Sequence, residues 1–260
     1  MSRLPIVFFG HGSPMVALEQ SEVTQSWART AALIGKPRAI LCISAHWLTR
    51  GTAVTAMPQP QTIHDFGAFP QALFDVRYPA PGNPGLAERV QDLLAPLRVA
   101  SDHSWGLDHG TWSVLVHAYP DADVPVVQLS MDVSKNPEGH WQIGRKLRAL
   151  RDEGVLIIGT GNIVHNLGAM DWNNPNAQPY PWAERFNNTM LAAVAADQPE
   201  VVIDFAALGE AARLSVPTPD HFWPLLYVLG ARHEGEAAQF EPSVIQHKSL
   251  GMTSILIGAA

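Results

Sequence analysis

Three short apolar segments of the chain each run directly into a turn that carries a histidine, namely His11, His46 and His165. In an open α/β sheet the carboxyl ends of the strands share one edge, and ligands bind in the crevice at that edge. Glycines beside His11 and His165 allow sharp turns and close approach of a ligand to the backbone. We therefore expect the three imidazoles to face one place.

Two further histidines lie in turn-rich, aromatic surroundings: His109 precedes Trp112, and His221 precedes Trp223. Several neutral imidazoles converging on a dry aromatic pocket are typical of a site for a first-row transition metal. A single histidine near a strand end is more often an ordinary polar residue than a ligand. Five further histidines lie in helical or polar segments and are expected at the surface or as helix caps: His103, His117, His140, His233 and His247.

The elements that must position these side chains alternate along the chain. Short, almost wholly apolar runs bounded by turn residues predict strands at residues 5–9, 39–44, 124–130, 155–159 and 254–257. Apolar residues at helical spacing predict intervening helices near residues 21–34, 84–94, 143–150, 186–194 and 220–229. This alternation predicts a single α/β domain over residues 1–260, with a mostly parallel central sheet flanked by helices.

One segment between the predicted elements is long and irregular. Residues 171–182 contain three Asn, three Pro and two Trp, and we predict a loop or lid there. The aromatic residues nearest the candidate histidines, Trp47, Trp112 and Trp223, are candidates for the walls of a pocket.

Composition excludes several classes of protein. The 260 residues carry 17 basic and 24 acidic side chains, a net charge of -7, without a basic run, which argues against a nucleic-acid partner. No apolar stretch approaches the roughly 18 residues of a membrane span, and the N-terminus does not resemble a secretory signal. The single cysteine, Cys42, allows no internal disulfide and is expected to be inert core, so we expect a cytoplasmic protein. Only 16% of residues are charged, which is compatible with a homo-oligomer.

Seven blocks of the sequence, in the same order, resemble the class III (LigB-type) extradiol ring-cleavage dioxygenases, and within them the 4,5-DOPA extradiol dioxygenase branch. The resemblance spans nearly the whole chain. The blocks are residues 8–14, 44–47, 62–67, 78–82, 106–112, 161–166 and 218–222.

The resemblance implies an α/β fold, one divalent metal ion, and O2-dependent cleavage of a catechol beside its two hydroxyls. It implies His11, His46 and His221 as metal ligands. His165 is implied as the acid/base residue and His109 as a second catalytic histidine that contacts substrate or oxygen. His64, Asp65 and Phe66 resemble a stretch near the substrate.

The implied metal is Fe2+, although Zn2+ binds such sites more tightly and fits the same three ligands. Many related sites include a carboxylate among the ligands, and the acids nearest His221 are Asp220 and Glu234. A zinc-dependent hydrolase that uses the same three histidines is the competing interpretation. A binding protein without activity is disfavoured, because all five candidate histidines are present.

Overall fold

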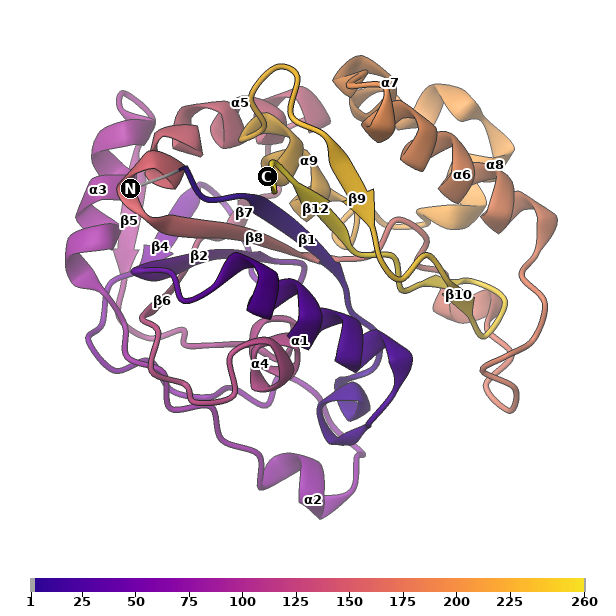
Figure 1. The fold of residues 1–260 in the computed structure, drawn as a ribbon, viewed down its shortest axis with the longest axis horizontal. Helices are drawn as coiled ribbons and strands as arrows, with labels where there is room; N and C mark the ends of the chain where they lie inside the picture. Colours follow the sequence, from indigo (N-terminus) through magenta and orange to yellow (C-terminus); the bar gives the residue numbers. More distant parts are fainter. Residues whose placement is uncertain (1–2, 260) are drawn as a thin grey trace.

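The apolar segments predicted as strands form one central sheet (Figure 1). The computed structural model describes residues 3–259. Within that range the order of the strands across the sheet is β6-β2-β8-β1-β12-β9. Their bounds are β1 (Ile6–Gly10), β2 (Ala39–Ser44), β6 (Val126–Gln128), β8 (Val155–Gly161), β9 (Ala238–Phe240) and β12 (Ile255–Ile257).

The sheet is mostly parallel, as predicted. Strand β8 pairs in parallel with β1 on one side and with β2 on the other, and β2 pairs in parallel with β6. Strands β12 and β9 close the far edge in antiparallel orientation. Every residue of β1, β2 and β8 is buried, which explains why these strands are apolar on both faces.

Helices cover both faces of the sheet (Figure 1). On one face, the core contains side chains of α3, α5, α6 and α9, whereas α1 and α4 pack on the other face. The bounds of the helices among residues 3–259 are α1 (Glu22–Ile34), α2 (Gln71–Phe74), α3 (Pro84–Leu94), α4 (His109–Ala118), α5 (Pro137–Leu147), α6 (Pro181–Ala195), α7 (Pro199–Ile203), α8 (Glu210–Ser215) and α9 (Trp223–Gly230).

Local sequence signals explain where several of these helices begin. The side chain of Asn83 accepts a hydrogen bond of 3.0 Å from the backbone N–H of Leu86, and Pro84 occupies the first turn of α3. The predicted irregular segment is confirmed as far as Tyr180, and α6 begins at Pro181. In the described part of the chain, no helix has both the length and the apolar character needed to cross a membrane.

Three two-stranded ladders lie outside the central sheet. They pair β3 (Leu48–Thr49) with β7 (Met131–Asp132), β4 (Thr52–Thr55) with β5 (Val99–Asp102), and β10 (Ile245–Gln246) with β11 (Leu250–Gly251). The last ladder connects to the end of β8, because Leu250 forms an isolated bridge with His165.

Candidate active site

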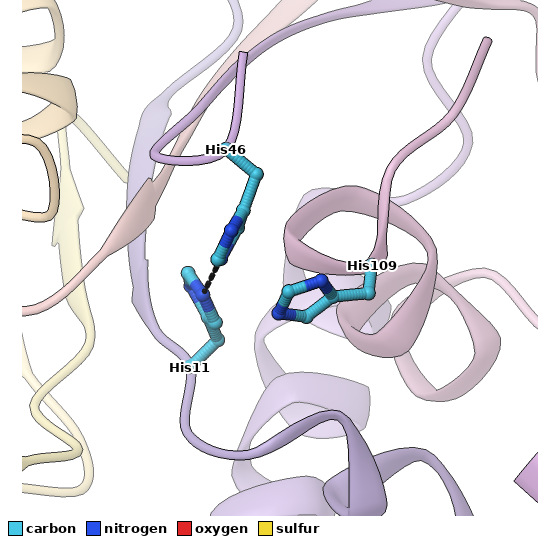
Figure 2. Close-up of side chains that lie close together, drawn as sticks. All are labelled: His11, His46 and His109. Carbon is cyan, nitrogen blue, oxygen red and sulfur yellow. Dashed lines mark hydrogen bonds between the residues drawn. The ribbon is translucent and has the colours of Figure 1, made fainter. Parts of the chain in front are cut away.

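Three imidazoles from separate parts of the chain lie together at the carboxyl edge of the sheet (Figure 2). His11 follows β1, His46 follows β2, and His109 is the first residue of α4. The Nε2 atoms of His11 and His46 are 3.0 Å apart. One ring nitrogen from each of the three residues lies within 4.8 Å of the others. The predicted convergence of His11 and His46 is therefore present, and His109 completes the closest trio.

His221 and His165 border the same cluster. The His221 ring lies 5.5 Å from the His11 ring and 5.0 Å from the His46 ring, measured between centroids. The His165 ring is stacked on His221 at 3.6 Å, with an interplanar angle of 5°. All five candidate histidines thus occupy one region. The His109 ring is nearer to His46, with centroids 3.8 Å apart, but at 6.0 Å it is farther from His11 than the His221 ring is. Because the close group of ring nitrogens contains His109 and not His221, assignment of His221 as the third ligand stays a prediction.

The residues after β8 join three segments that are far apart in the sequence. The backbone N–H of Asn162 donates to the carbonyl of His221 over 2.8 Å, and its side-chain amide donates to the carbonyls of His11 and Gly251. A Cβ on Gly161 would lie 2.1 Å from the His221 carbonyl oxygen, so only glycine allows this approach. This role of Asn162 has no signal in the sequence, because its contacts are all long-range.

A buried carboxylate fixes the start of α4, and therefore the position of His109. Asp108 caps this helix by accepting the backbone N–H of Thr111, and it also accepts hydrogen bonds from Ser44 and Gln128. A Cβ on Gly110 would lie 2.7 Å from Cδ2 of His46, so glycine allows the helix to approach that ring. Asp108 and Gly110 were not recognised as site residues from sequence.

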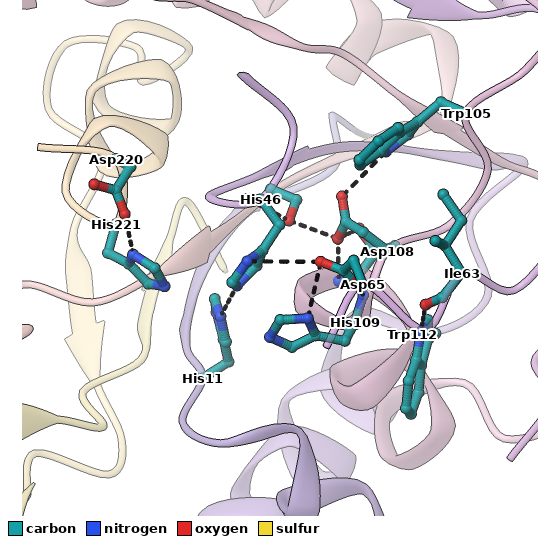
Figure 3. A network of polar contacts seen from close by, with 12 residues as sticks. His11, His46, Ile63, Asp65, Trp105, Asp108, His109, Trp112, Asp220 and His221 are labelled. Atoms are coloured by element: carbon teal, nitrogen blue, oxygen red, sulfur yellow. Dashed lines mark hydrogen bonds and ion pairs between the residues drawn. The ribbon is translucent and has the colours of Figure 1, made fainter. Parts of the chain in front are cut away.

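Two carboxylates contact the Nδ1 atoms of the cluster (Figure 3). Oδ2 of Asp65 lies 3.0 Å from Nδ1 of His109 and 3.7 Å from Nδ1 of His46. Asp220 contacts Nδ1 of His221. Of the two acids considered near His221, Asp220 touches an imidazole directly, whereas Glu234 is exposed at the surface.

Burial keeps three imidazoles of the site, those of His11, His46 and His165, uncharged. Burial lowers the pKa of both His11 and His46 well below the ordinary value, and the neighbouring imidazoles lower it further. For His165, burial together with His221 lowers the pKa to about 3. Burial alone raises the pKa of the Asp65 carboxyl, but its contacts with His109 outweigh this effect and hold the pKa below its usual value. At neutral pH we therefore expect neutral rings in His11, His46 and His165 and a charged Asp65 carboxylate.

This donor set fits a divalent metal ion. Neutral imidazoles offer nitrogen lone pairs, and carboxylates behind the ligands are typical of metal sites, because they orient the rings and strengthen the donors. The Nδ1 atom of His11 is buried without a hydrogen-bond partner among residues 3–259, so its Nε2 atom is the one engaged in the cluster. The cluster therefore has the composition of a site for a first-row metal.

A cavity of about 810 Å³ opens onto the cluster. Its lining includes His46, His109, His165 and His221, which we call the histidine side. The irregular segment after residue 170 and the turn that carries His247 supply another part of the lining, the exposed side, which includes Trp172. The position of the predicted loop at a binding cavity agrees with the sequence analysis.

The structure also bears on the predictions for His140, His247 and Cys42. His140 is fully buried, contrary to prediction, because its Nδ1 atom pairs with the Tyr227 hydroxyl at 2.9 Å and its ring packs on Trp223. His247, also expected to be peripheral, lines the cavity. Cys42 is buried as expected.

The three Trp residues predicted to line the cavity lie elsewhere. In the described chain, Trp47 stacks on Trp105, Trp112 donates its indole N–H to the Ile63 carbonyl, and Trp223 packs on His140, so none of the three lines the cavity. The cavity lining instead includes Phe69 and Trp172, both on loops. Trp172 is 63% exposed.

The stretch from His64 to Phe66 lies behind the cluster. His64 contacts the Val76 carbonyl, and Phe66 packs edge-on against His109 with centroids 5.6 Å apart. Among residues 3–259, His64, Asp65 and Phe66 are absent from the cavity lining. Direct substrate contact by these residues stays a prediction, whereas contact of Asp65 and Phe66 with His109 is present.

Comparisons with known proteins agree with the geometry. Residues 5–258 match the family described as the catalytic LigB subunit of aromatic ring-opening dioxygenase. The chain is 49% identical to a protein of Escherichia coli (strain K12) named 4,5-DOPA dioxygenase extradiol, over 99% of this chain and 96% of the relative. It is 39% identical to a protein of the same name from Beta vulgaris, over 89% of this chain and 88% of the relative.

A solved structure supports the same conclusion. The crystal structure of an uncharacterized protein from Escherichia coli K12 superposes with a TM-score of 0.86 at 44% identity, and the match covers 98% of this chain and 100% of that chain. Fold, metal-compatible histidine cluster and sequence similarity agree over almost the whole length. The chain therefore belongs to the LigB family of aromatic ring-opening dioxygenases.

Proposed function

We propose that the protein is an extradiol dioxygenase that inserts O2 into the ring of a catechol, beside its two hydroxyls, to give a ring-opened semialdehyde. The observation that carries this proposal is the convergence of five histidines at one end of a large cavity. Three of them are held neutral by burial, which suits metal ligation.

We infer that Fe2+ is the working metal and that His11, His46 and His221 hold it, with Zn2+ able to occupy the same site. Bound there, the ion supplies Lewis acidity toward the catechol hydroxyls and a redox centre for O2. Because three neutral imidazoles add no negative charge, a divalent ion held by them would keep its full positive charge. Such a site favours anionic ligands such as a catecholate. His109, which lies in the closest trio, is the alternative third ligand.

The remaining side chains have roles that follow from their protonation state and position. His165 is uncharged at neutral pH, so it is able to accept a hydroxyl proton from the catechol and to return it during ring opening. Its stacking on His221 holds its ring beside the cluster. We assign His109 the donation of a hydrogen bond to a substrate or oxygen atom. Asp65 and Phe66 act on substrate through His109.

The substrate we propose is a catechol with a side chain, DOPA or a similar compound. The E. coli and Beta vulgaris relatives carry that substrate in their names. A cavity of about 810 Å³ exceeds the volume of one catechol ring, and the wall that contains Trp172 provides an apolar surface for the rest of the molecule.

We further propose that the whole chain is one catalytic domain whose partners are a small catechol and O2. The lone, buried Cys42 supports a cytoplasmic location, where thiols stay reduced. Assembly into a homo-oligomer stays a prediction from the low content of charged residues.

The test is direct. Metal-free protein is loaded with Fe2+ under anaerobic conditions, a catechol and air are added, and oxygen uptake is followed together with the visible absorbance of a yellow product. DOPA, protocatechuate and catechol itself are compared. Absence of oxygen uptake with all three, in protein with confirmed bound iron, would contradict the proposal. Hydrolysis of an ester or amide by the zinc-loaded protein without oxygen consumption would select a hydrolase instead.

A further inference from the structure

His247 belongs to the exposed side of the cavity and has no part in the proposed metal site. It lies in the turn between β10 and β11. Its backbone N–H donates to the carbonyl of Pro175 over 3.0 Å, and its carbonyl accepts the N–H of Asp171 over the same distance. Its Nδ1 atom lies 2.9 Å from the carbonyl oxygen of Asp171. Three polar atoms of His247 thus hold the turn against the irregular segment.

These contacts leave Nε2 as the polar atom of His247 that is able to meet a molecule in the cavity. A carbonyl oxygen only accepts hydrogen bonds, so the contact with Asp171 places a proton on Nδ1. In the neutral ring, Nε2 is then an acceptor. The backbone φ of His247 is +50°, a conformation that is uncommon for residues other than glycine. The turn holds this conformation while the residue lines the cavity.

The other charged and aromatic groups of the exposed side favour a cation. Among residues 3–259, the cavity lining contains no Lys or Arg, and its one carboxylate is that of Glu19. The Trp172 ring lies beside His247, with centroids 6.4 Å apart, and the face of an indole attracts a cation. The ammonium of Lys248 lies outside the lining, 3.6 Å from the Asp171 carboxylate. A positively charged side chain of a substrate therefore finds partners on this side, whereas a carboxylate does not.

We propose that His247 is a specificity-determining residue whose Nε2 atom accepts a hydrogen bond from an ammonium group on the side chain of the catechol. Trp172 offers the same group an aromatic face, and Glu19 offers it an opposite charge. This inference rests on the proposed function and deepens it, because it names the amino group, and not a carboxylate, as the part of the side chain that is recognised.

The variant His247→Asn separates recognition from folding. The Asn amide N–H lies close to the position of Nδ1, so it retains a donor for the Asp171 carbonyl, and Asn also tolerates a left-handed backbone. It has no atom at the position of Nε2. His103→Asn is the matched control, because it makes the same chemical change at an exposed histidine outside the cavity lining. Urea unfolding is expected to give similar midpoints for both variants and the wild type.

The first readout is binding without turnover. Calorimetry under anaerobic conditions measures the affinity of Zn2+-loaded protein for three catechols with side chains of similar length: dopamine carries an ammonium, 4-propylcatechol a methyl group and dihydrocaffeate a carboxylate. The measurements are made at about pH 8, above the range in which free imidazole titrates. We expect the wild type to bind dopamine most tightly.

The variants are expected to change the affinity for dopamine alone. A hydrogen bond to a charged group is lost in His247→Asn, so binding of dopamine should weaken by about 10- to 100-fold, with binding of 4-propylcatechol unchanged. Glu19→Gln should weaken binding of dopamine by only about 2- to 5-fold, because solvent screens this exposed carboxylate. The second readout is steady-state oxygen uptake by Fe2+-loaded protein, in which His247→Asn should raise KM for dopamine and leave kcat unchanged.

Two results would overturn the proposal. One is equal binding of dopamine and dihydrocaffeate by the wild type, a comparison that does not depend on the folding of any variant. The other is an equal loss of affinity for dopamine and 4-propylcatechol in His247→Asn. Selective binding of dopamine without oxygen uptake from any of the three compounds would contradict the proposed function alone. Oxygen uptake without this selectivity would contradict the role of His247 alone.

Discussion

The two sides of the cavity are built in different ways. On the histidine side, His109 is buried, and the rings of His46, His109 and His221 each have an Nδ1 atom that faces a carboxylate. On the exposed side, Trp172 is 63% exposed, and Leu167, which also lines the cavity just before this segment, is 47% exposed. The histidine side is fixed by long-range polar contacts, whereas the other side presents apolar surface to the solvent.

The exposed side is nevertheless anchored. The backbone N–H of Asp171 donates to the carbonyl of His247 over 3.0 Å, and the N–H of Tyr180 donates to the carbonyl of Lys248 over 3.1 Å. Backbone bonds of this kind do not depend on the identity of the side chains. The difference indicates that one side sets the chemistry and resists substitution, while the other is able to change its side chains, and hence its substrate, without loss of the fold.

The largest expected effect tests the histidine side. His165→Ala removes the neutral ring that we assign to proton transfer, so the rate of ring opening is expected to fall by about 10²- to 10⁴-fold. The metal content of the purified protein should remain that of the wild type. Metal analysis and oxygen uptake check both statements. Loss of the metal in this variant would show instead that His165 is a ligand.

His140 belongs to neither side and shows what burial of an imidazole does by itself. Burial lowers its pKa from 6.5 to about 4. Between these pH values the unfolded chain binds a proton that the folded chain excludes, so the free energy of unfolding falls as the pH decreases. When the pH decreases through the whole of this range, the free energy of unfolding falls by about 3 kcal/mol.

The matched variant isolates that contribution. His140→Phe keeps a ring against Trp223 but does not titrate, so its stability should be less sensitive to pH between 6.5 and 4. At pH 7 the variant is expected to be less stable by about 1 kcal/mol, because the Tyr227 hydroxyl loses its partner. Urea unfolding of both proteins at several pH values measures the difference. Parallel stability curves would show that His140 contributes nothing to the pH dependence.

The smallest expected effect tests the exposed side. Trp172→Ala removes an aromatic surface from the cavity, and an aromatic contact contributes about 0.5–1.5 kcal/mol. We expect KM for a catechol with a side chain to rise about 2- to 12-fold, with kcat unchanged and with little effect on unsubstituted catechol. Leu33→Ala, an exposed apolar residue on α1, is the control. A fall in kcat with unchanged KM would mean that Trp172 acts on the chemistry.

Much of the fold was predictable because its signals are local. The buried strands are continuous apolar runs, and α3 begins with the cap and proline that the sequence predicts. Strand β9 was missed, because its three half-buried or exposed residues lack that character. The site residues His11 and His46 were predictable from their place after such strands.

The contacts between residues of the site were harder to predict from the sequence. Asp65 faces His109 across 44 residues, and Asn162 bonds to His11 across 151 residues, so no local pattern reports either contact. His140 was misplaced because its helix has a polar composition, although the ring itself turns toward Tyr227. Resemblance to a family identifies which histidines matter, but it does not show which carboxylates orient them.

The contacts of Asn162 have a consequence for how the protein folds. This one residue bonds to backbone near the start of the chain, at His11, and near its end, at His221 and Gly251. While the chain is being synthesised, Asn162 lacks these bonding partners until the last of the three segments is complete. The site therefore assembles only when both ends of the chain have joined the sheet, and an incomplete chain does not present a finished metal site.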